Sequence, residues 1–181
     1  RDWALQNLKC PIGLRVKKAD KVGDRIFIEG NSAAALGAVY GGATVCAWYP
    51  ITPSTSMVDS IMGFQNLRRD PDTGKETIAV IQAEDEIAAI GMLVGAGWAG
   101  ARALTSTSGP GISLMAEFTG LAYYAEIPFV IWDITRMGPS TGLPTRTSQG
   151  DLMFTYFLGH GDSRQVILLP GSVEECFEFG W

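Results

Sequence analysis

Apolar and polar positions alternate in blocks along most of the chain, and the blocks predict a repeated strand–helix order. Short, continuous apolar runs rich in β-branched or aromatic residues predict buried strands. The expected strands are RIFIEG (25–30), TVCAWY (44–49), TIAVIQA (77–83), ARALTSTS (101–108) and IPFVIWDI (127–134).

Longer, alanine- and glycine-rich runs between these strands predict helices. The first helix has Asn31 as its expected N-cap, and a polar turn, RDPDTGKE, precedes the third strand. The expected helices are NSAAALGAVYGG, TSMVDSIMGFQNLRR, EDEIAAIGMLVGAGWAG, GISLMAEFTGLAYYAE and SVEECFEF.

This alternation predicts an α/β fold with a mostly parallel sheet and helices on both faces. In such sheets, ligands bind beyond the carboxyl ends of the strands. YPITPST, TSTSGPG and the loop that starts at Arg136 all follow strands. We therefore expect these three polar segments to share one edge of the sheet and to form one site.

The composition limits the number of domains and the class of partner, but it does not indicate a function. The 181 residues are 46% hydrophobic and 18% charged, which suits one domain with a core. The net charge of −5 argues against a nucleic-acid surface. The basic cluster of Arg15, Lys17, Lys18 and Lys21 is typical of a solvated linker.

Cysteine usage and the ends of the chain add further limits. Cys10, Cys46 and Cys176 lie far apart without a CxxC motif, which excludes a self-contained zinc or iron–sulfur site and fits a reducing, cytoplasmic setting. We see no signal-peptide layout, and the uncharged run 87–101 is shorter than the roughly 20 residues that span a bilayer. Because the first residue is Arg1, we expect the sequence to be part of a longer chain.

The YPITPST segment, residues 49–55, is stiffened by two prolines that bracket Thr52. Each proline fixes its own φ and restricts the residue before it, so the Thr52 hydroxyl would be held in place, as a binding site requires. The simpler interpretation is a rigid turn that caps the next helix. Both roles are compatible if Ser54 or Thr55 is the cap.

Three acids, Glu84, Asp85 and Glu86, open a helix that is otherwise uncharged. Compensation of the helix macrodipole accounts for one of the first two. Glu86 differs because it stands at the boundary of the apolar run, where it would be carried into the interior. The two interpretations of Glu86, a helix-start acid or a functional carboxyl, stay open at this point.

Two further segments carry candidate chemistry. TSTSGPGISL joins a strand to a helix, and free N–H groups at that helix start could hold an anion, although the segment lacks the lysine of a phosphate loop. The loop 136–151 is long enough to be functional, and Arg136 follows its strand directly. A guanidinium there suits a carboxylate or phosphate, whereas a surface salt bridge is the expectation for Arg146. We assign no chemistry to His160.

Taken together, several segments resemble the alpha subunit of 2-oxoacid:ferredoxin oxidoreductases, most of all the 2-oxoglutarate branch. They are GNSAAALGA, YPITPST, EDEIAAIG, TSTSGPGISLM, GPSTGLPTRTSQGDL and LLPGSVEECF. The resemblance implies a thiamine-diphosphate pyrimidine-binding domain at residues 25–181, truncated at its C-terminus. Residues 1–24 would be a connector from a missing upstream domain.

The resemblance also implies roles for individual residues. Glu86 would be the catalytic residue: it would bond the aminopyrimidine ring of thiamine diphosphate and favour the imino tautomer that takes the thiazolium proton. Thr52, Arg136 and Thr145 would bind the substrate. The expected cofactor-binding residues are Tyr49, Pro50, Ile51, Glu86, Ser108 and Gly109.

The implied activity is a coenzyme-A-acylating oxidative decarboxylation of a 2-oxoacid that reduces ferredoxin. The family's GDG-plus-asparagine motif is absent from this chain. Mg²⁺, the diphosphate site and a [4Fe-4S] cluster are therefore expected in a partner beta subunit, without which this chain would be inactive. We expect a hetero-oligomer with no nucleic-acid or membrane partner and no metal site of its own.

The sequence leaves alternatives open. The substrate expected first is 2-oxoglutarate, with pyruvate, branched-chain 2-oxoacids and indolepyruvate as alternatives. The residues around Arg136 read TRM where the family has glutamine–arginine–glycine, which affects the shape of the substrate pocket. A different class is a non-catalytic α/β nucleotide-binding or scaffold module, which would need no carboxyl at the position of Glu86.

Overall fold

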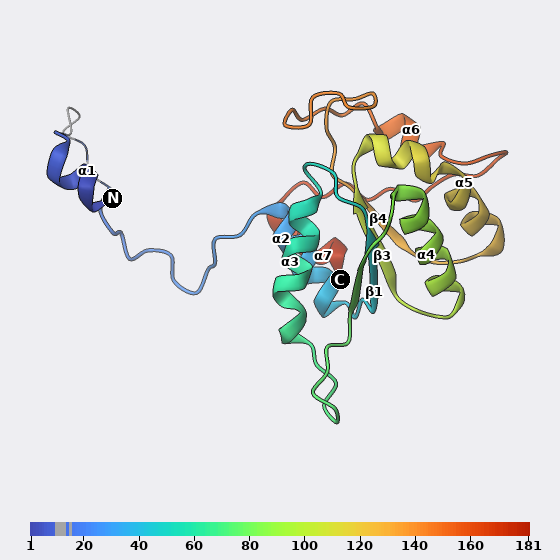
Figure 1. The fold of residues 1–181 in the computed structure, drawn as a ribbon, viewed down its shortest axis with the longest axis horizontal. Coiled ribbons are helices and arrows are strands. Elements are labelled where there is room, and N and C mark those ends of the chain that lie inside the picture. The colour runs from blue at the N-terminus through green and yellow to red at the C-terminus, as the bar shows by residue number, and fades with distance from the viewer. Residues whose placement is uncertain (10–13, 15) are drawn as a thin grey trace.

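In the computed structural model, four parallel strands form one sheet in the order β2-β1-β3-β4 (Figure 1). The strands are β1 (Val45–Trp48), β2 (Ala79–Gln82), β3 (Ala103–Thr107) and β4 (Val130–Asp133). All three pairings are parallel, and β3 is buried along its whole length. This confirms the predicted parallel α/β fold.

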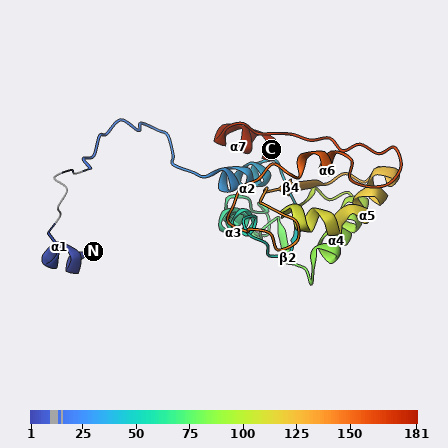
Figure 2. The same cartoon turned by 90° about the horizontal axis from the view of Figure 1, so that it is seen from above.

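Helices cover both faces of the sheet, as predicted (Figures 1 and 2). On one face lie α2 (Gly30–Tyr40), α3 (Thr55–Phe64) and α7 (Val173–Gly180). On the other face lie α4 (Glu86–Trp98) and α5 (Gly109–Ala125). The helices that follow β1, β2 and β3 thus carry the chain from the carboxyl end of one strand back to the amino end of the next.

Hydrophobic cores on both faces of the sheet hold the three layers together. Successive side chains of a strand point to opposite faces, so Cys46 and Trp48 pack against α2 and α3 while Ala47 packs against α4. The strand β3 contributes Leu104 to the first core and Ala103 to the second. Burial raises the pKa of the Cys46 thiol to about 12, which makes it an inert packing residue.

The sequence prediction was wrong for the segment 25–29, which is irregular rather than a strand. Ile26 and Phe27 are exposed there, because no strand edge lies beside the segment to complete a ladder. Asn31 is not the N-cap of α2. Glu29 holds that position without a side-chain cap bond, and the Asn31 amide donates instead to the carbonyl of Pro53 (3.2 Å) and to Ser56 Oγ (2.8 Å).

The structure describes residues 1–9, 14 and 16–181, so Cys10 and Arg15 lie outside the described residues. The short helix α1 (Asp2–Asn7) stands apart from the sheet, and residues 16–29 lead to α2 without a helix or strand (Figure 1). Within the described ranges, no helix combines the length and apolar character needed to cross a membrane.

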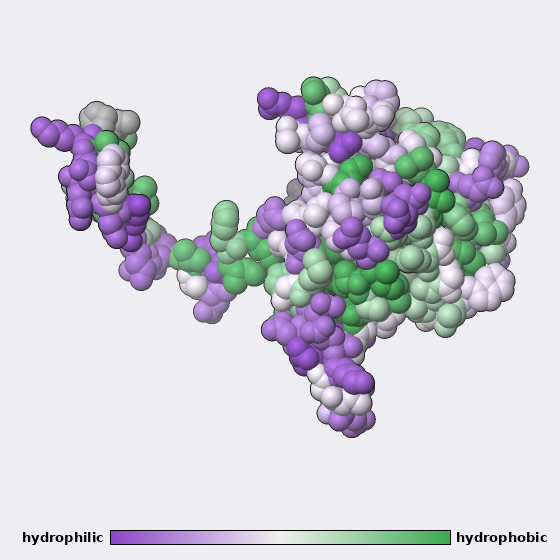
Figure 3. All heavy atoms as spheres, in the orientation of Figure 1, coloured by the Kyte–Doolittle hydropathy of each residue, from purple (hydrophilic) through white to green (hydrophobic). Residues whose placement is uncertain are grey.

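The predicted polar turn forms a hairpin that projects from the amino end of the sheet (Figures 1 and 3). It follows the short 3₁₀ helix η1 (Gln65–Leu67), and its surface is hydrophilic. Arg69 bridges to Glu76 across the hairpin, and Asp70 Oδ1 accepts the backbone N–H of Thr73 at 2.7 Å. These local bonds account for the turn without any contribution from the core.

The backbones of α2 and α7 are in close contact. A Cβ on Gly37 would overlap the carbonyl oxygen of Phe177, and one on Gly180 would lie 2.5 Å from the carbonyl oxygen of Ala34. Glycine is required at both positions because any larger residue would push the two helices apart.

We therefore expect Gly37→Ala to destabilise the full-length protein by about 1–3 kcal/mol, the usual scale for overpacking. Gly63→Ala is the matched control, since no atom lies within 4 Å of its Cβ position on α3. That change should be neutral or stabilising by up to about 1 kcal/mol. Urea unfolding of both variants checks the prediction, and equal midpoints would contradict it.

Candidate active site

Polar loops follow all four strands at the carboxyl edge of the sheet. Tyr49 comes after β1, Glu86 after β2, Ser108 after β3 and Arg136 after β4. Because every pairing in the sheet is parallel, these loops lie at the same edge, as the sequence predicted.

Arg136 joins the loop after β4 to the YPITP segment. Its Nη1 donates to the carbonyl oxygen of Thr52 at 2.8 Å, and its Nη2 donates to the carbonyls of Ser140 (3.1 Å) and Thr141 (3.3 Å). The side chain is only 7% exposed, and its Nε is buried without a hydrogen-bond partner in the described part of the chain. Three of the five N–H donors of the guanidinium are therefore bonded to carbonyls of the protein.

Backbone hydrogen bonds between its two arms close the loop 136–150. The N–H of Met137 donates to the carbonyl of Arg146 at 2.7 Å, and that of Leu143 donates to the carbonyl of Met137 at 2.9 Å. Gly142 has a positive φ of 46°, and a Cβ there would overlap the carbonyl of Met137. Thr145, a predicted substrate residue, is exposed on the returning arm next to Arg146.

The YPITP segment is organised around the carbonyl oxygen of Ile51. It accepts the Ser54 N–H (2.8 Å) and the Ser54 hydroxyl (2.9 Å), while Thr55 Oγ1 accepts the Ile51 N–H at 3.2 Å. Ser54 is the N-cap residue of α3 by position, but its hydroxyl does not cap the helix. Thr52 and Pro50 are exposed, so the segment presents them outward from a fixed backbone.

Asp85 and Glu86 have different roles at the start of α4. Asp85 is the N-cap of α4, and its carboxylate accepts the Ala88 N–H at 2.7 Å. Glu84 is exposed. Glu86 is only 9% exposed, and a Cβ on Gly111 would lie 3.1 Å from its Cγ. Because Asp85 already caps the helix, Glu86 is not needed for that purpose.

Two buried hydroxyls lie where β3 leads into α5. Thr107 at the end of β3 and Ser108 at the start of α5 are almost fully buried, and neither hydroxyl has a hydrogen-bond partner among the described residues. A Cβ on Gly111 would collide with Thr107 Oγ1, so that hydroxyl points toward the first turn of α5. Unpaired buried polar atoms of this kind are uncommon and mark a site where a partner is missing.

Asp151 lies at the N-terminus of α5, where the sequence predicted a possible anion site. A Cβ on Gly109 would be 2.6 Å from Asp151 Oδ1, so the chain's own carboxyl covers the N-terminus of α5. Gly109 and Ser108 are both buried beneath it. A phosphate at this helix start would meet a negative charge rather than a vacant set of N–H groups.

Sequence reasoning missed the pair formed by Asp151 and Asp133. Asp133 is the last residue of β4, and burial, then the charge of Asp151, raises its pKa from 3.8 to about 7. Burial also raises the pKa of Asp151. An acid that ends the otherwise apolar run FVIWD was the available signal for Asp133.

The raised pKa of Asp133 predicts a stability that depends on pH. The folded state holds this proton more tightly than the unfolded state, so the contribution of Asp133 to stability is complete below pH 3.8 and is lost as pH rises to about 7. The full shift corresponds to at most about 4 kcal/mol. Asp133→Asn should remove this decline, and urea unfolding between about pH 5 and pH 8 measures it. Parallel curves for variant and wild type would contradict the assignment.

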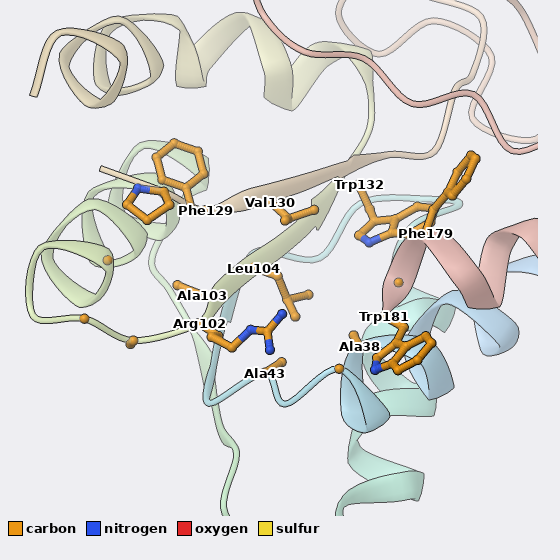
Figure 4. Close-up of a pocket in the computed structure, with 16 residues that line it drawn as sticks. Ala38, Ala43, Arg102, Ala103, Leu104, Phe129, Val130, Trp132, Phe179 and Trp181 are labelled. Carbon is orange, nitrogen blue, oxygen red and sulfur yellow. The ribbon is translucent and has the colours of Figure 1, made fainter. Parts of the chain in front are cut away.

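The cavity of about 430 Å³ drawn in Figure 4 lies away from these loops. It lies between the start of β3, β4 and the end of α7, and its walls include Leu104, Val130, Trp132 and Trp181. Its lining is apolar apart from Arg102, and no predicted site residue contributes to it. We therefore place the candidate site at the loops that Arg136 joins and at the unpaired buried polar atoms, and not at this cavity.

Comparison with known proteins now decides the family. Residues 35–180 match the thiamine-diphosphate-binding domain of the pyruvate flavodoxin/ferredoxin oxidoreductases. The chain belongs to this family. The match includes the YPITP segment, Glu86, the start of α5 and the loop after β4, and it confirms the resemblance drawn from the sequence.

Relatives of known name agree with this assignment. The chain is 48% identical over 167 residues to 2-oxoacid:ferredoxin oxidoreductase 1, subunit alpha, of Sulfurisphaera tokodaii, covering 90% of this chain and 27% of that one. It is 46% identical to the 2-oxoglutarate synthase subunit KorA of Methanocaldococcus jannaschii, covering 84% and 40%. The chain therefore spans between about a quarter and two-fifths of the length of these relatives.

A solved structure has the same fold. The 2-oxoglutarate:ferredoxin oxidoreductase of Magnetococcus marinus, with 2-oxoglutarate, coenzyme A and succinyl-CoA bound, superposes with a TM-score of 0.77 at 40% identity. The match covers 86% of this chain and 26% of that one. The α/β fold of a thiamine-diphosphate-binding domain is thus shown both by sequence and by structure.

The residues present fit part of thiamine diphosphate. An aminopyrimidine ring needs a carboxyl partner for a ring nitrogen, and Glu86 supplies a largely buried carboxyl with no ion pair to any described residue. A diphosphate needs cations, which do not gather at the start of α5, where Asp151 lies. The chain therefore suits the ring end of the cofactor rather than its diphosphate.

Proposed function

We propose that this chain is the pyrimidine-binding part of the alpha subunit of a 2-oxoacid:ferredoxin oxidoreductase. The observation that carries the proposal is the division of the acids at the start of α4. Asp85 caps the helix, and this leaves Glu86 buried at the carboxyl edge of the sheet in a thiamine-diphosphate-binding family. The reaction would be the oxidative decarboxylation of a 2-oxoacid, with coenzyme A accepting the acyl group.

Glu86 is the catalytic residue of this proposal. When bound, thiamine diphosphate supplies the carbanion chemistry that stabilises the decarboxylated substrate. The Glu86 carboxyl would bond a nitrogen of the pyrimidine ring, and its burial would strengthen that hydrogen bond. The other cofactor-binding residues would be Tyr49, Pro50 and Ile51 of the YPITP segment, and Ser108 and Gly109 at the start of α5.

Arg136 and Thr52 form the substrate end of the site. We assign a carboxylate of the 2-oxoacid to this guanidinium, because its planar N–H donors match the geometry of a carboxylate. Thr52 is exposed on the segment that Arg136 holds in place, so its hydroxyl can reach the same ligand. Thr145 lies on the returning arm of the loop and would be the third substrate-binding residue.

The substrate we favour is 2-oxoglutarate, because a KorA relative is a 2-oxoglutarate synthase subunit and the Magnetococcus marinus enzyme has 2-oxoglutarate bound. Pyruvate and branched-chain 2-oxoacids are alternatives, since other relatives are named only for 2-oxoacids. A dicarboxylic substrate needs a second cationic contact, for which the exposed Arg146 is the candidate in this loop.

The remaining cofactors and the electron acceptor would belong to partner proteins. A beta subunit would supply the diphosphate site with Mg²⁺ and a [4Fe-4S] cluster, and ferredoxin would accept the electrons. The names of the relatives support such an assembly, because they describe this type of chain as a subunit. We place the complete hetero-oligomer in the cytoplasm.

The test compares Glu86→Ala with Glu84→Ala in the full-length complex. Viologen-dye reduction with 2-oxoglutarate and coenzyme A should fall by a factor of about 100 or more in Glu86→Ala, the scale for a lost acid–base group. Glu84→Ala removes an exposed acid from the same turn and should leave the rate unchanged. Equal rates for both variants would contradict the role of Glu86, and a wild-type complex inert with every 2-oxoacid would overturn the activity.

A further inference from the structure

Side chains from outside the YPITP segment bond two successive carbonyls within it. Arg136 Nη1 donates to the carbonyl of Thr52 at 2.8 Å, and Asn31 Nδ2 donates to the carbonyl of Pro53 at 3.2 Å. Arg136 belongs to the loop between β4 and α6 (Leu152–Tyr156), and Asn31 belongs to α2. The segment is therefore held by one element that precedes it in the sequence and by one that follows it.

The segment needs such support because it has few backbone donors. Pro50 and Pro53 carry no N–H, so neither can form the backbone bonds that ordinarily fix a turn. The N–H of Ile51 donates to Thr55 Oγ1 at 3.2 Å. At Thr52 and Pro53, bonds from side chains to the carbonyls thus take the place of backbone pairing.

The orientation of the Asn31 amide follows from its partners. A carbonyl oxygen only accepts hydrogen bonds, so the nitrogen of the amide faces Pro53, and the same nitrogen donates to Ser56 Oγ at 2.8 Å. Glu29 already occupies the N-cap position of α2. Asparagine is a weak helix former, and these two bonds, rather than a cap, account for it in the first turn of α2.

Helix α2 is a rigid support for this amide. Ala34 and Ala35 bury the helix in the core, and Ser32 Oγ lies 2.8 Å from Ser60 Oγ on α3. A side chain on a packed helix holds its partner more precisely than one on a loop does. The Asn31 amide therefore fixes the end of the YPITP segment relative to the rest of the fold.

We propose that Asn31 is a positioning residue of the substrate site, which together with Arg136 fixes the exposed Thr52 hydroxyl for the 2-oxoacid. Bonds to the carbonyls of Thr52 and Pro53 fix the backbone on the C-terminal side of Thr52. Loss of the Asn31 bond allows the hydroxyl more positions, and the free energy of ordering it again is then taken from substrate binding. This effect on binding rests on the proposed function, whereas the anchoring of the segment does not.

Two variants and a control separate the bond to Pro53 from the general packing of α2. Asn31→Asp keeps the size of the side chain and can still accept the Ser56 hydroxyl, but it has no N–H for the carbonyl of Pro53. Asn31→Ala removes both bonds. Ser32→Ala is the matched control, because it removes the neighbouring bond from α2 to Ser60 without touching the YPITP segment.

Hydrogen–deuterium exchange of the full-length protein measures the anchoring directly. The amides of Ser54 and Thr55, which both donate to the carbonyl of Ile51, report on the segment. Both should exchange roughly tenfold faster in the two Asn31 variants, on the scale of one lost hydrogen bond, and at the wild-type rate in Ser32→Ala. Unchanged exchange in the Asn31 variants, or an equal increase in Ser32→Ala, overturns the proposal.

A distant amide distinguishes local release of the segment from a general loosening of the fold. The N–H of Ile127 donates to the carbonyl of Ala122 at 3.0 Å, at the end of α5 on the other face of the sheet. Its exchange should stay at the wild-type rate in every variant. An equal increase there in the Asn31 variants assigns Asn31 a merely structural role and overturns the proposal. If Asn31→Ala does not fold, Asn31→Asp decides alone.

The second readout is the KM for the 2-oxoacid in the assembled enzyme. In Asn31→Asp, KM should rise roughly tenfold with a smaller change in kcat, because Thr52 serves the substrate and Glu86 serves the cofactor. Ser32→Ala should keep the wild-type KM. A KM that is unchanged in Asn31→Asp overturns the role in substrate binding. A wild-type complex without turnover on any 2-oxoacid refutes the proposed function, while the exchange rates still decide the anchoring.

Discussion

The site depends on the parallel order of the four strands. Parallel pairing brings every carboxyl end to one edge, so residues far apart in sequence meet there without any long excursion of the chain. The bond from Arg136 to the carbonyl of Thr52 spans 84 residues in sequence, yet it needs only that β1 and β4 flank β3 in the same direction. If one of these strands ran the other way, its loop would lie at the opposite edge.

Acids at this edge have distinct roles that follow from their surroundings. Asp85 satisfies the start of α4, and Asp151 lies over the start of α5, so both helix dipoles are matched by the chain's own carboxyls. Glu86 is then left for a ligand, whereas burial and the charge of Asp151 raise the pKa of Asp133. The arrangement favours a ring that meets Glu86 and disfavours a phosphate at the start of α5.

The sequence predicted the repeated strand–helix order, the parallel sheet and the shared edge, because the apolar runs and polar breaks are strong local signals. It also singled out Glu86, which the structure buries, and Arg136, which the structure joins to Thr52. It failed at residues 25–29, where apolar residues have no strand to pair with, and at Asn31, whose amide finds partners 22 and 25 residues away. Asp133 and Asp151 escaped notice because the burial that raises their pKa values exists only after folding.

The most direct test of the central claim is the exchange of the C2 proton of thiamine diphosphate bound to the full-length alpha subunit assembled with its partner. Rapid acid quench and NMR would compare wild type with Glu86→Gln, which keeps the size of the side chain and removes its proton-holding carboxyl. The account predicts exchange slower by a factor of about 100 or more in the variant. Equal exchange rates in the two proteins would contradict it, because Glu86 would then have no part in activating the cofactor.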